Sequence, residues 1–334
     1  MAYDGRILAR AREIIAENKK NNDEELARRR DEVSRRVPAV IEAEAEITKL
    51  MTSVASDALK KGFDAGSAVE TVKDQCDLLL KRRAELLKSA GYPADYTDEL
   101  FNCPVCRDTG YVLGKPCDCL KDLYKAEAVR ALSSTLNVDG QSFESFNLSY
   151  YDKTPDIGGV VPFQTMKNVF ELCREYSLKF GKNSMNLLFR GGTGLGKTFL
   201  AASVAKVVSE NGFSVVYDTA ISVMEAFELQ KFDRSGDNAE ETAARVRRYL
   251  DCDLLILDDL GTEMTTNFTQ SALYSLMNGR LLSGGKTLIT TNLTEEELRK
   301  RYTPQIVSRL EGEYLVLNFA GRDIRAIKRG LGLK

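Results

Sequence analysis

Residues 185–199 read MNLLFRGGTGLGKTF. The second half of this stretch fits the pattern G-x-x-x-x-G-K-[ST], and it lies between an apolar run and a helical stretch at residues 199–209. In this pattern the glycines let backbone N–H groups approach phosphate oxygens, and the lysine places a positive charge at the β and γ phosphates. The stretch therefore predicts a strand, a helix and, between them, a phosphate-binding loop formed by Gly191, Gly192, Thr193, Gly194, Leu195, Gly196, Lys197 and Thr198.

Two acidic residues end another apolar run, because residues 254–259 read LLILDD. A phosphate loop of this kind works with an acid on a neighbouring strand that holds Mg²⁺, and the loop hydroxyl supplies a second oxygen. We expect Asp258 and Thr198 to bind the magnesium ion, directly or through water, and Asp259 to orient or activate the attacking water. Glu263 is a second candidate for that last role. Paired acids at a strand end also form turns or helix caps, but the phosphate loop upstream favours the catalytic interpretation.

The rest of the C-terminal half alternates apolar strands with helical segments. This alternation predicts an α/β fold in which crossover helices connect parallel strands. The expected sheet has five strands, at residues 186–189, 214–218, 254–258, 286–291 and 314–319.

The N-terminal region is different, because residues 3–90 are rich in Ala, Glu, Lys, Arg and Leu at helical spacing. We expect helix breaks at residues 21–23, at Val37-Pro38, at residues 62–66 and at residues 91–93. Positive and negative charges nearly balance, which fits a solvated helical hairpin or coiled coil. A partner-docking arm is the alternative.

Four of the seven cysteines cluster as Cys103-x-x-Cys106 and Cys117-x-Cys119. The chain contains no histidine, so all four ligands of a metal site here would be cysteines. Four thiolates complete the coordination of a structural zinc ion, and such an ion supplies folding free energy to a ribbon too small for its own core. Zinc is the favoured interpretation. An iron–sulfur cluster and a disulfide or redox pair are the alternatives.

The absence of histidine also excludes Ser-His-Asp triads, Cys-His proteases, histidine phosphorelays and His-ligated catalytic zinc. The formal net charge of -2 gives no global attraction to nucleic acid or anionic lipid. No apolar run reaches the ~18 residues of a membrane span, and residues 1–11 carry charges without an apolar segment behind them. We therefore expect a cytoplasmic protein without membrane contact.

With these motifs the chain resembles the AAA+ ATPases of the group that contains bacterial helicase loaders and IstB-type transposition helpers, over residues 143–334. The resemblance implies ATP hydrolysis, with Asn292 sensing the γ phosphate, Arg309 acting as an arginine finger in a neighbouring subunit's site, and Arg325 as the second sensor. Each of these could instead be a helix cap or a surface cation. This sequence departs from the family pattern at Asp259, where most AAA+ proteins have glutamate. Aspartate is one methylene shorter, so we expect slow turnover or a switch-like use of ATP.

The changes in composition, the cysteine cluster and the resemblance together divide the chain into four expected parts. They are a helical partner-binding region at residues 1–100, a zinc ribbon at 101–121, a helix and linker at 122–160, and an AAA+ ATPase domain at 161–334. In the family the linker contacts adenine, a role that would fall to Phe143 and Phe146. The two phenylalanines could equally be a core edge.

The resemblance also implies a function in DNA replication. We expect an ATPase with ATP, Mg²⁺ and Zn²⁺ as cofactors, which loads a replicative helicase, binds single-stranded DNA and self-associates through its AAA+ domain. A cysteine ribbon before the ATPase resembles the helicase-contacting domain of Bacillus-type loaders. An IstB-type transposition helper and an ATP-binding scaffold without turnover are the alternatives. The C-terminal tail is basic, with Arg322, Arg325, Lys328, Arg329 and Lys334. These cations either offset the dipole at the end of a helix or contact nucleotide or DNA phosphates.

Overall fold

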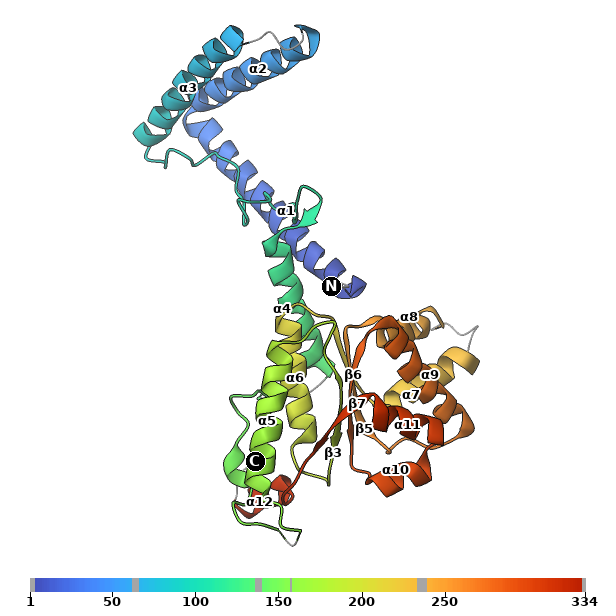
Figure 1. The fold of residues 1–334 in the computed structure, drawn as a ribbon. Coiled ribbons are helices and arrows are strands. Elements are labelled where there is room, and N and C mark those ends of the chain that lie inside the picture. Colours follow the sequence, from blue (N-terminus) through green and yellow to red (C-terminus); the bar gives the residue numbers. More distant parts are fainter. Residues whose placement is uncertain (1–3, 62–65, 136–139, 157, 233–238, 332–334) are drawn as a thin grey trace. The chain divides into compact units, whose positions relative to one another are not determined.

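The computed structural model describes residues 4–61, 66–135, 140–156, 158–232 and 239–331 (Figure 1). The chain divides into two compact units, of which one is Arg12–Leu120 and the other combines Met1–Ala11 with Lys121–Lys334. The division at Leu120 lies next to the end of the cysteine-rich segment.

Three helices dominate the first unit: α1 (Gly5–Arg36), which begins in the other unit, α2 (Pro38–Lys61) and α3 (Gly66–Ser89). The predicted start at Pro38 is confirmed, since a proline at the first helical position lacks only an N–H that would be unpaired anyway. The predicted end of α3 is also confirmed. Gly91 adopts φ 85°, and the N–H of Tyr92 reaches back to the carbonyl of Leu87 at 2.9 Å, which closes the helix. Most of the break expected at residues 62–66 lies outside the described residues.

The break predicted at residues 21–23 is wrong, because α1 runs through it without interruption. The Asn22 amide donates to Asn102 Oδ1 at 2.7 Å and to Asp108 Oδ2 at 3.0 Å. A side chain with such distant partners does not compete for its own helix backbone, which is how asparagine otherwise ends helices.

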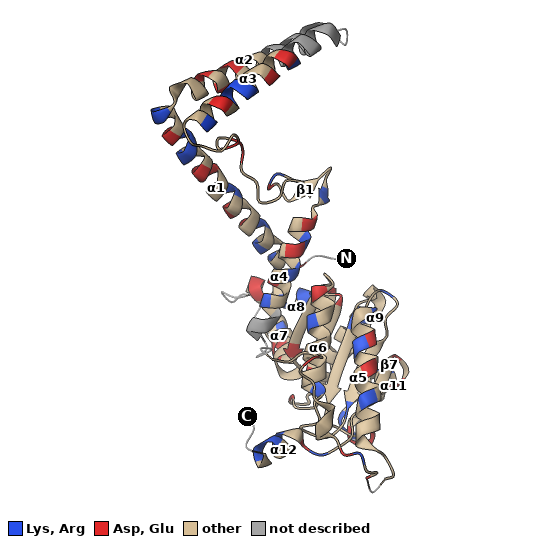
Figure 2. Cartoon of the chain, turned by 90° about the vertical axis from the view of Figure 1, so that its left-hand side faces the viewer, with Lys and Arg blue, Asp and Glu red and all other residues tan. Residues whose placement is uncertain are grey.

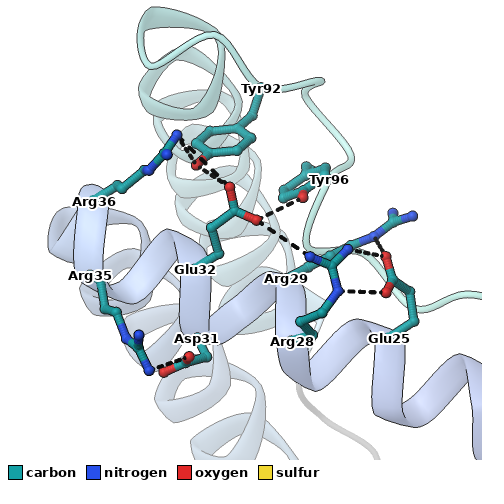
Figure 3. A network of polar contacts seen from close by, with 9 residues as sticks. All are labelled: Glu25, Arg28, Arg29, Asp31, Glu32, Arg35, Arg36, Tyr92 and Tyr96. Atoms are coloured by element: carbon teal, nitrogen blue, oxygen red, sulfur yellow. Dashed lines mark hydrogen bonds and ion pairs between the residues drawn. The ribbon is translucent and has the colours of Figure 1, made fainter.

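A polar network ties α1 to the segment after α3 (Figure 3). Glu32 accepts hydrogen bonds from Tyr92 Oη at 2.8 Å and Tyr96 Oη at 3.2 Å, and the two rings stack with centroids 4.7 Å apart. The bond from Tyr92 is the main reason why the pKa of Glu32 lies below its usual value. Nearer the start of α1, Arg28 and Arg29 both donate hydrogen bonds to Glu25.

The second unit contains a five-stranded sheet whose order is β4-β5-β6-β3-β7. All neighbouring strands are parallel, as predicted. The strands are β3 (Asn186–Arg190), β4 (Val215–Thr219), β5 (Leu254–Leu260), β6 (Lys286–Thr291) and β7 (Tyr314–Asn318), so each expected strand is found within two residues of its predicted ends.

Helices cover both faces of this sheet, which confirms the α/β fold class (Figure 1). One face packs against α5 (Pro162–Leu178) and α6 (Lys197–Glu210), with a core that includes Phe189, Leu200 and Ile256. The other face packs against α7 (Ala220–Phe232), α8 (Ala239–Asp251), α9 (Asn267–Ser283), α10 (Glu295–Arg301) and α11 (Pro304–Gly312).

The remaining elements complete the two units. They are the hairpin of β1 (Tyr111–Val112) and β2 (Lys115–Pro116), α4 (Asp118–Thr135), the 3-10 turn η1 (Leu148–Tyr150) and α12 (Ile324–Gly330). Lys and Arg residues recur along the helices, as Figure 2 shows. Among the described residues, no helix has the combination of length and apolar character needed to span a bilayer.

Candidate functional site

The phosphate loop forms one wall of a cavity of about 240 Å³ at the carboxyl ends of the strands. In parallel α/β sheets, ligands bind at this edge. Residues distant in sequence complete the wall, among them Phe146, Asp259, Asn292 and Arg325. The cavity therefore brings together most of the residues that the sequence nominated separately.

Lys197 is buried at the start of α6, with 5% of its surface exposed. Its Nζ donates to the carbonyl oxygens of Gly191 and Gly192, both at 2.7 Å, and to Asn292 Oδ1 at 2.6 Å. Burial lowers the pKa of Lys197, while the Asp259 and Asp258 carboxylates act in the opposite direction. The ammonium is thus held at the loop where phosphate oxygens would lie.

Thr198 and Asp258, the two predicted magnesium ligands, lie side by side. Thr198 Oγ1 is 3.2 Å from Asp258 Oδ2, and the carboxylate is buried. One carboxylate and one hydroxyl are hard oxygen donors of the kind that Mg²⁺ uses together with nucleotide phosphates, so these residues fit the ion.

Thr290 organises the acidic pair, a role that the sequence did not suggest. Its hydroxyl donates to Asp258 Oδ1 at 2.5 Å and accepts the N–H of Asp259 at 2.9 Å. Thr290 belongs to the same Thr290-Thr291-Asn292 stretch that nominated Asn292, and alternate residues of a strand share a face. That alternation is the signal that could have found it.

Asp259 departs from regular strand geometry. The pairing register of β5 with β6 shifts between Leu257 and Leu260, and Asp259 adopts a left-handed backbone with φ 56°. In a regular strand two successive side chains point to opposite faces, whereas a bulge redirects one of them. Asp259 consequently lines the cavity, where burial and the neighbouring Asp258 charge raise its pKa.

Glu263, the second candidate for the water-orienting role, is buried elsewhere. Its carboxylate accepts the N–H of Gly261 at 2.8 Å and the hydroxyl of Tyr302, and the described residues that line the cavity do not include it. Its contacts hold the loop that follows Asp259.

The C-terminal helix α12 is attached directly to the phosphate loop. Asp323 caps α12 by accepting the N–H of Arg325 at 2.8 Å, and the N–H of Ile324 donates to the carbonyl of Gly194 at 3.0 Å. A Cβ at Gly194 would collide with the Asp323 carboxylate, so only glycine fits this contact. The attachment places Arg325 and Lys328 at the cavity, while Arg322 pairs with Asp152 at 2.8 Å and Lys334 lies outside the described residues.

Arg309 is separate from this group. It lies on α11, where Nε donates to Asn278 Oδ1 at 3.0 Å and the side chain is 40% exposed. The described lining of the cavity does not include it. The structure thus leaves Arg309 outside the site of its own chain.

The two linker phenylalanines have different environments. Phe143 is buried against the edge of Phe170, with ring centroids 5.6 Å apart. Phe146 stacks on the same ring at 5.5 Å and also lines the cavity. Phe143 is therefore a core residue, and of the two phenylalanines Phe146 is the one that reaches the cavity, which Tyr150 and Phe199 also line.

The four predicted zinc ligands converge in the first unit. All their sulfur atoms lie within 4.8 Å of one another, with Cys103 to Cys117 at 3.8 Å and Cys106 to Cys119 at 3.4 Å. Tetrahedral zinc with Zn–S bonds of ~2.3 Å needs sulfur separations of about 3.8 Å, so the cluster fits this ion. None of the seven cysteines, all of which the structure describes, forms a disulfide.

Asp108 supports the first pair of cysteines, which the sequence did not indicate. It adopts φ 55°, is buried, and accepts the N–H groups of Cys103 at 2.8 Å and Asn102 at 2.9 Å. Such contacts fix the backbone that carries the ligands.

An aromatic and basic patch on the surface was also missed. Lys231 Nζ lies 5.2 Å from the ring centroid of Phe232 on α7 and 4.7 Å from that of Phe268 on α9. Phe232 is 67% exposed. We call Lys231, Phe232 and Phe268 the Phe232 patch. No sequence window could reveal it, because α7 and α9 meet only in the fold.

Comparison with known proteins finds similarity over part of the chain. Residues 164–308 match the family model of the IstB-like ATP binding proteins. The replicative helicase loader DnaC of Escherichia coli K12 is 26% identical over 143 residues, which are 43% of this chain and 57% of DnaC. The chromosomal replication initiator protein DnaA of Campylobacter fetus is 28% identical over 131 residues, 39% of this chain and 28% of DnaA.

A crystal structure of the DnaC helicase loader aligns with a TM-score of 0.43 and 19% identity, covering 54% of this chain and 97% of that one. The chain spans little more than half the length of the curated DnaC proteins that it matches. Residues 164–308 thus resemble the IstB-like ATP binding proteins, and the chain is similar to the DnaC helicase loader over 43% of its length.

Proposed function

We propose that the chain is an ATP-hydrolysing AAA+ protein that acts in DNA replication in the cytoplasm, as a loader of a replicative helicase onto single-stranded DNA. The observation that carries the proposal is the convergence of Lys197, Asp259 and Asn292 on the cavity, beside the Thr198 and Asp258 pair. The similarity to a replicative helicase loader supports the biological setting.

Each residue of the site has a chemical task in this proposal. Lys197 binds the β and γ phosphates, and Thr198 and Asp258 hold Mg²⁺, which neutralises charge on the phosphate oxygens. Asp259 orients the attacking water and accepts its proton. Asn292 donates its amide to a γ-phosphate oxygen. The short side chain of Asp259 leaves the water less tightly held than a glutamate would, which favours slow turnover.

Nucleotide binding and hydrolysis are tested separately, by a fluorescent ATP analogue and by phosphate release. Lys197→Ala should weaken binding, because it removes a charge aimed at the phosphates. Asp259→Asn should bind normally and hydrolyse slowly, and Asp259→Glu should raise turnover. Equal losses of binding in Lys197→Ala and Asp259→Asn would show that Asp259 does not act on the water. Binding by the wild type without any turnover would favour the scaffold alternative.

The Phe232 patch supports the DNA part of the proposal. Exposed aromatic rings such as that of Phe232 stack with unpaired bases, and an adjacent lysine attracts the phosphate backbone, whereas Phe268 is half-buried and supports the patch from the core side. Within the described residues, Phe232 and Phe268 lie with centroids 5.5 Å apart and share Lys231. A base could stack on this surface without any sequence-specific contact.

We therefore expect single-stranded DNA to stimulate hydrolysis at low salt more than duplex DNA of the same sequence. Phe232→Ser should lose this stimulation and keep ATP binding. Leu282→Ser is the matched control, because Leu282 is also a solvent-exposed apolar residue of this domain, 89% exposed on α9. Stronger stimulation by duplex DNA would favour the transposition-helper alternative.

The helicase contact is proposed for the first unit, with its long helices and cysteine ribbon. Apolar residues are exposed on the ribbon, notably Leu113 at 98% and Val105 at 71%. Leu113→Asp should prevent co-elution with the purified replicative helicase of the same organism while ATP binding is unchanged. Co-elution equal to wild type would remove the ribbon from the contact.

A further inference from the structure

Tyr217 carries a buried polar atom that no described residue satisfies. It lies in β4 with 4% of its surface exposed, and its ring packs in the core between the sheet and α6. Its hydroxyl has no hydrogen-bond partner among the described residues. Buried hydroxyls are nearly always paired in native proteins, so an unpaired one calls for a ligand, an ion or a water.

Other buried tyrosines of this unit make Tyr217 an exception. Tyr249 donates to Asp218 Oδ2 at 2.6 Å, Tyr302 donates to Glu263, and Tyr151 donates to the carbonyl of Leu195 at 2.9 Å. In each of these the hydroxyl joins two elements of the fold. Tyr217 has the same burial without a structural bond of this kind.

The strand register places this hydroxyl toward the metal-binding pair. In the parallel ladder of β4 and β5, Tyr217 is opposite Ile256, and Thr219 is opposite Asp258. Alternate residues share a face, so Tyr217 and Asp258 both point to the face that α6 covers, and Thr198 lies in the first turn of α6.

The electrostatics agree with this placement. Burial raises the pKa of Tyr217, and the negative charge of Asp258 raises it further. Asp258 and Thr198 both influence the pKa of this hydroxyl, yet no side chain among the described residues forms a hydrogen bond of normal geometry with it. The unpaired hydroxyl therefore lies on the sheet face that also carries Asp258, one of the two residues expected to hold Mg²⁺.

We propose that Tyr217 is a third side chain of the magnesium site, whose hydroxyl oxygen accepts a hydrogen bond from a water in the shell of the ion. This inference rests on the nucleotide site proposed above. Mg²⁺ in nucleotide sites keeps several waters and uses few protein ligands, so residues that hold those waters help to determine its affinity. Tyr217 acts through the water and does not touch the phosphates.

Tyr217→Phe tests the proposal, because it removes one oxygen and leaves the ring in place. Ser209→Ala is the matched control. Ser209 Oγ is a second buried hydroxyl without a partner among the described residues, and it lies near the other end of α6. Both full-length variants are compared with wild type by thermal unfolding in EDTA and by binding of a fluorescent ATP analogue during a Mg²⁺ titration.

In EDTA, both variants should unfold at or above the wild-type temperature and bind the nucleotide with wild-type affinity, because neither loses a hydrogen bond. Tyr217→Phe should need about tenfold more Mg²⁺ to reach half of the metal-dependent gain in nucleotide affinity. This is the lower end of the range for residues that hydrogen-bond to the ligands of a metal ion. Ser209→Ala should follow wild type.

A wild-type Mg²⁺ dependence in Tyr217→Phe would overturn the proposal while leaving the nucleotide site intact. A clear loss of thermal stability in EDTA would also overturn it, since the hydroxyl would then have a structural partner. If wild-type protein bound no nucleotide at any Mg²⁺ concentration, the proposed function itself would fail.

Discussion

Lys197 donates a hydrogen bond of 2.6 Å from Nζ to Oδ1 of Asn292, whose amide nitrogen lies 3.4 Å from Asp259 Oδ1. Asn292 follows β6, and Lys197 belongs to the loop after β3, the neighbouring strand. The amide thus connects the cation proposed to bind phosphate with the residue proposed to orient water.

We predict that Asn292→Ala retains ATP binding within a few-fold of wild type and loses hydrolysis by on the order of 10², as for other single preorganised donors. Fluorescent-nucleotide titration and phosphate release measure the two effects. Asn318→Ala is the control, because Asn318 ends β7, which lies on the far side of β3 from β6, and it contacts Arg190 at 3.0 Å. A loss of ATP binding as large as that of Lys197→Ala would show that Asn292 contributes to nucleotide binding and not specifically to the hydrolysis step.

Zinc should be present at one ion per chain in protein purified without chelator, held by Cys103, Cys106, Cys117 and Cys119. The double variant Cys106→Ser and Cys119→Ser should lose the metal, because two sulfur ligands cannot close a tetrahedral site. Elemental analysis measures this, with Cys76→Ser, a buried cysteine of α3, as the control.

Removal of zinc should also loosen the first unit and leave ATP binding largely unchanged, because the cysteines and the nucleotide cavity belong to different compact units. Limited proteolysis and nucleotide titration follow the two units separately. Full retention of zinc in the double variant, or iron in place of zinc, would refute the assignment of the four cysteines as ligands of a zinc ion.

Arg309 should act in the site of a neighbouring subunit. Arginine fingers supplied in trans contribute ~10³ to 10⁵ in rate in well-studied phosphoryl-transfer enzymes. We predict that Arg309→Ala binds ATP but hydrolyses it poorly, and that wild-type hydrolysis rises more steeply than linearly with protein concentration.

Mixing is the sharper measurement for Arg309. Arg309→Ala subunits retain the Lys197 site and Lys197→Ala subunits retain the finger, so the mixture should regain part of the activity. Light scattering verifies that the mixed proteins assemble. Assembly without recovered activity would contradict the assignment in trans.

Arg280 should be a main determinant of stability, because it is 1% exposed and donates to backbone carbonyls at the end of α8. Its Nη1 lies 2.7 Å from the carbonyl of Tyr249 and 3.0 Å from that of Cys252. Arg280→Met leaves these buried acceptors unpaired, at about 1–3 kcal/mol each, so the free energy of unfolding should fall by about 3 kcal/mol or more.

Urea unfolding measures this loss. Arg299→Met, which changes a side chain that is 56% exposed, should stay within about 0.5 kcal/mol of wild type. An unchanged free energy of unfolding in Arg280→Met would show that water satisfies the carbonyls.

The sequence alone determined the features that depend on neighbours along the chain. The phosphate loop, the five strands and the cysteine pairs were predicted because spacing, apolar runs and glycine positions are local properties. The predicted interruption of α1 was wrong because it depended on contacts that are not local. The hydrogen-bond partners of Asn22 lie about eighty positions away in the sequence.

Only the tertiary structure decided which side chains surround the acids and the aromatic rings. Because the sheet places β6 between β5 and β3, Thr290 reaches Asp258 and Asn292 reaches Lys197 across neighbouring strands. The bulge that aims Asp259 at the cavity and the meeting of α7 with α9 have the same origin. Strand order and helix packing are set by burial of the whole core, which no local stretch of sequence encodes.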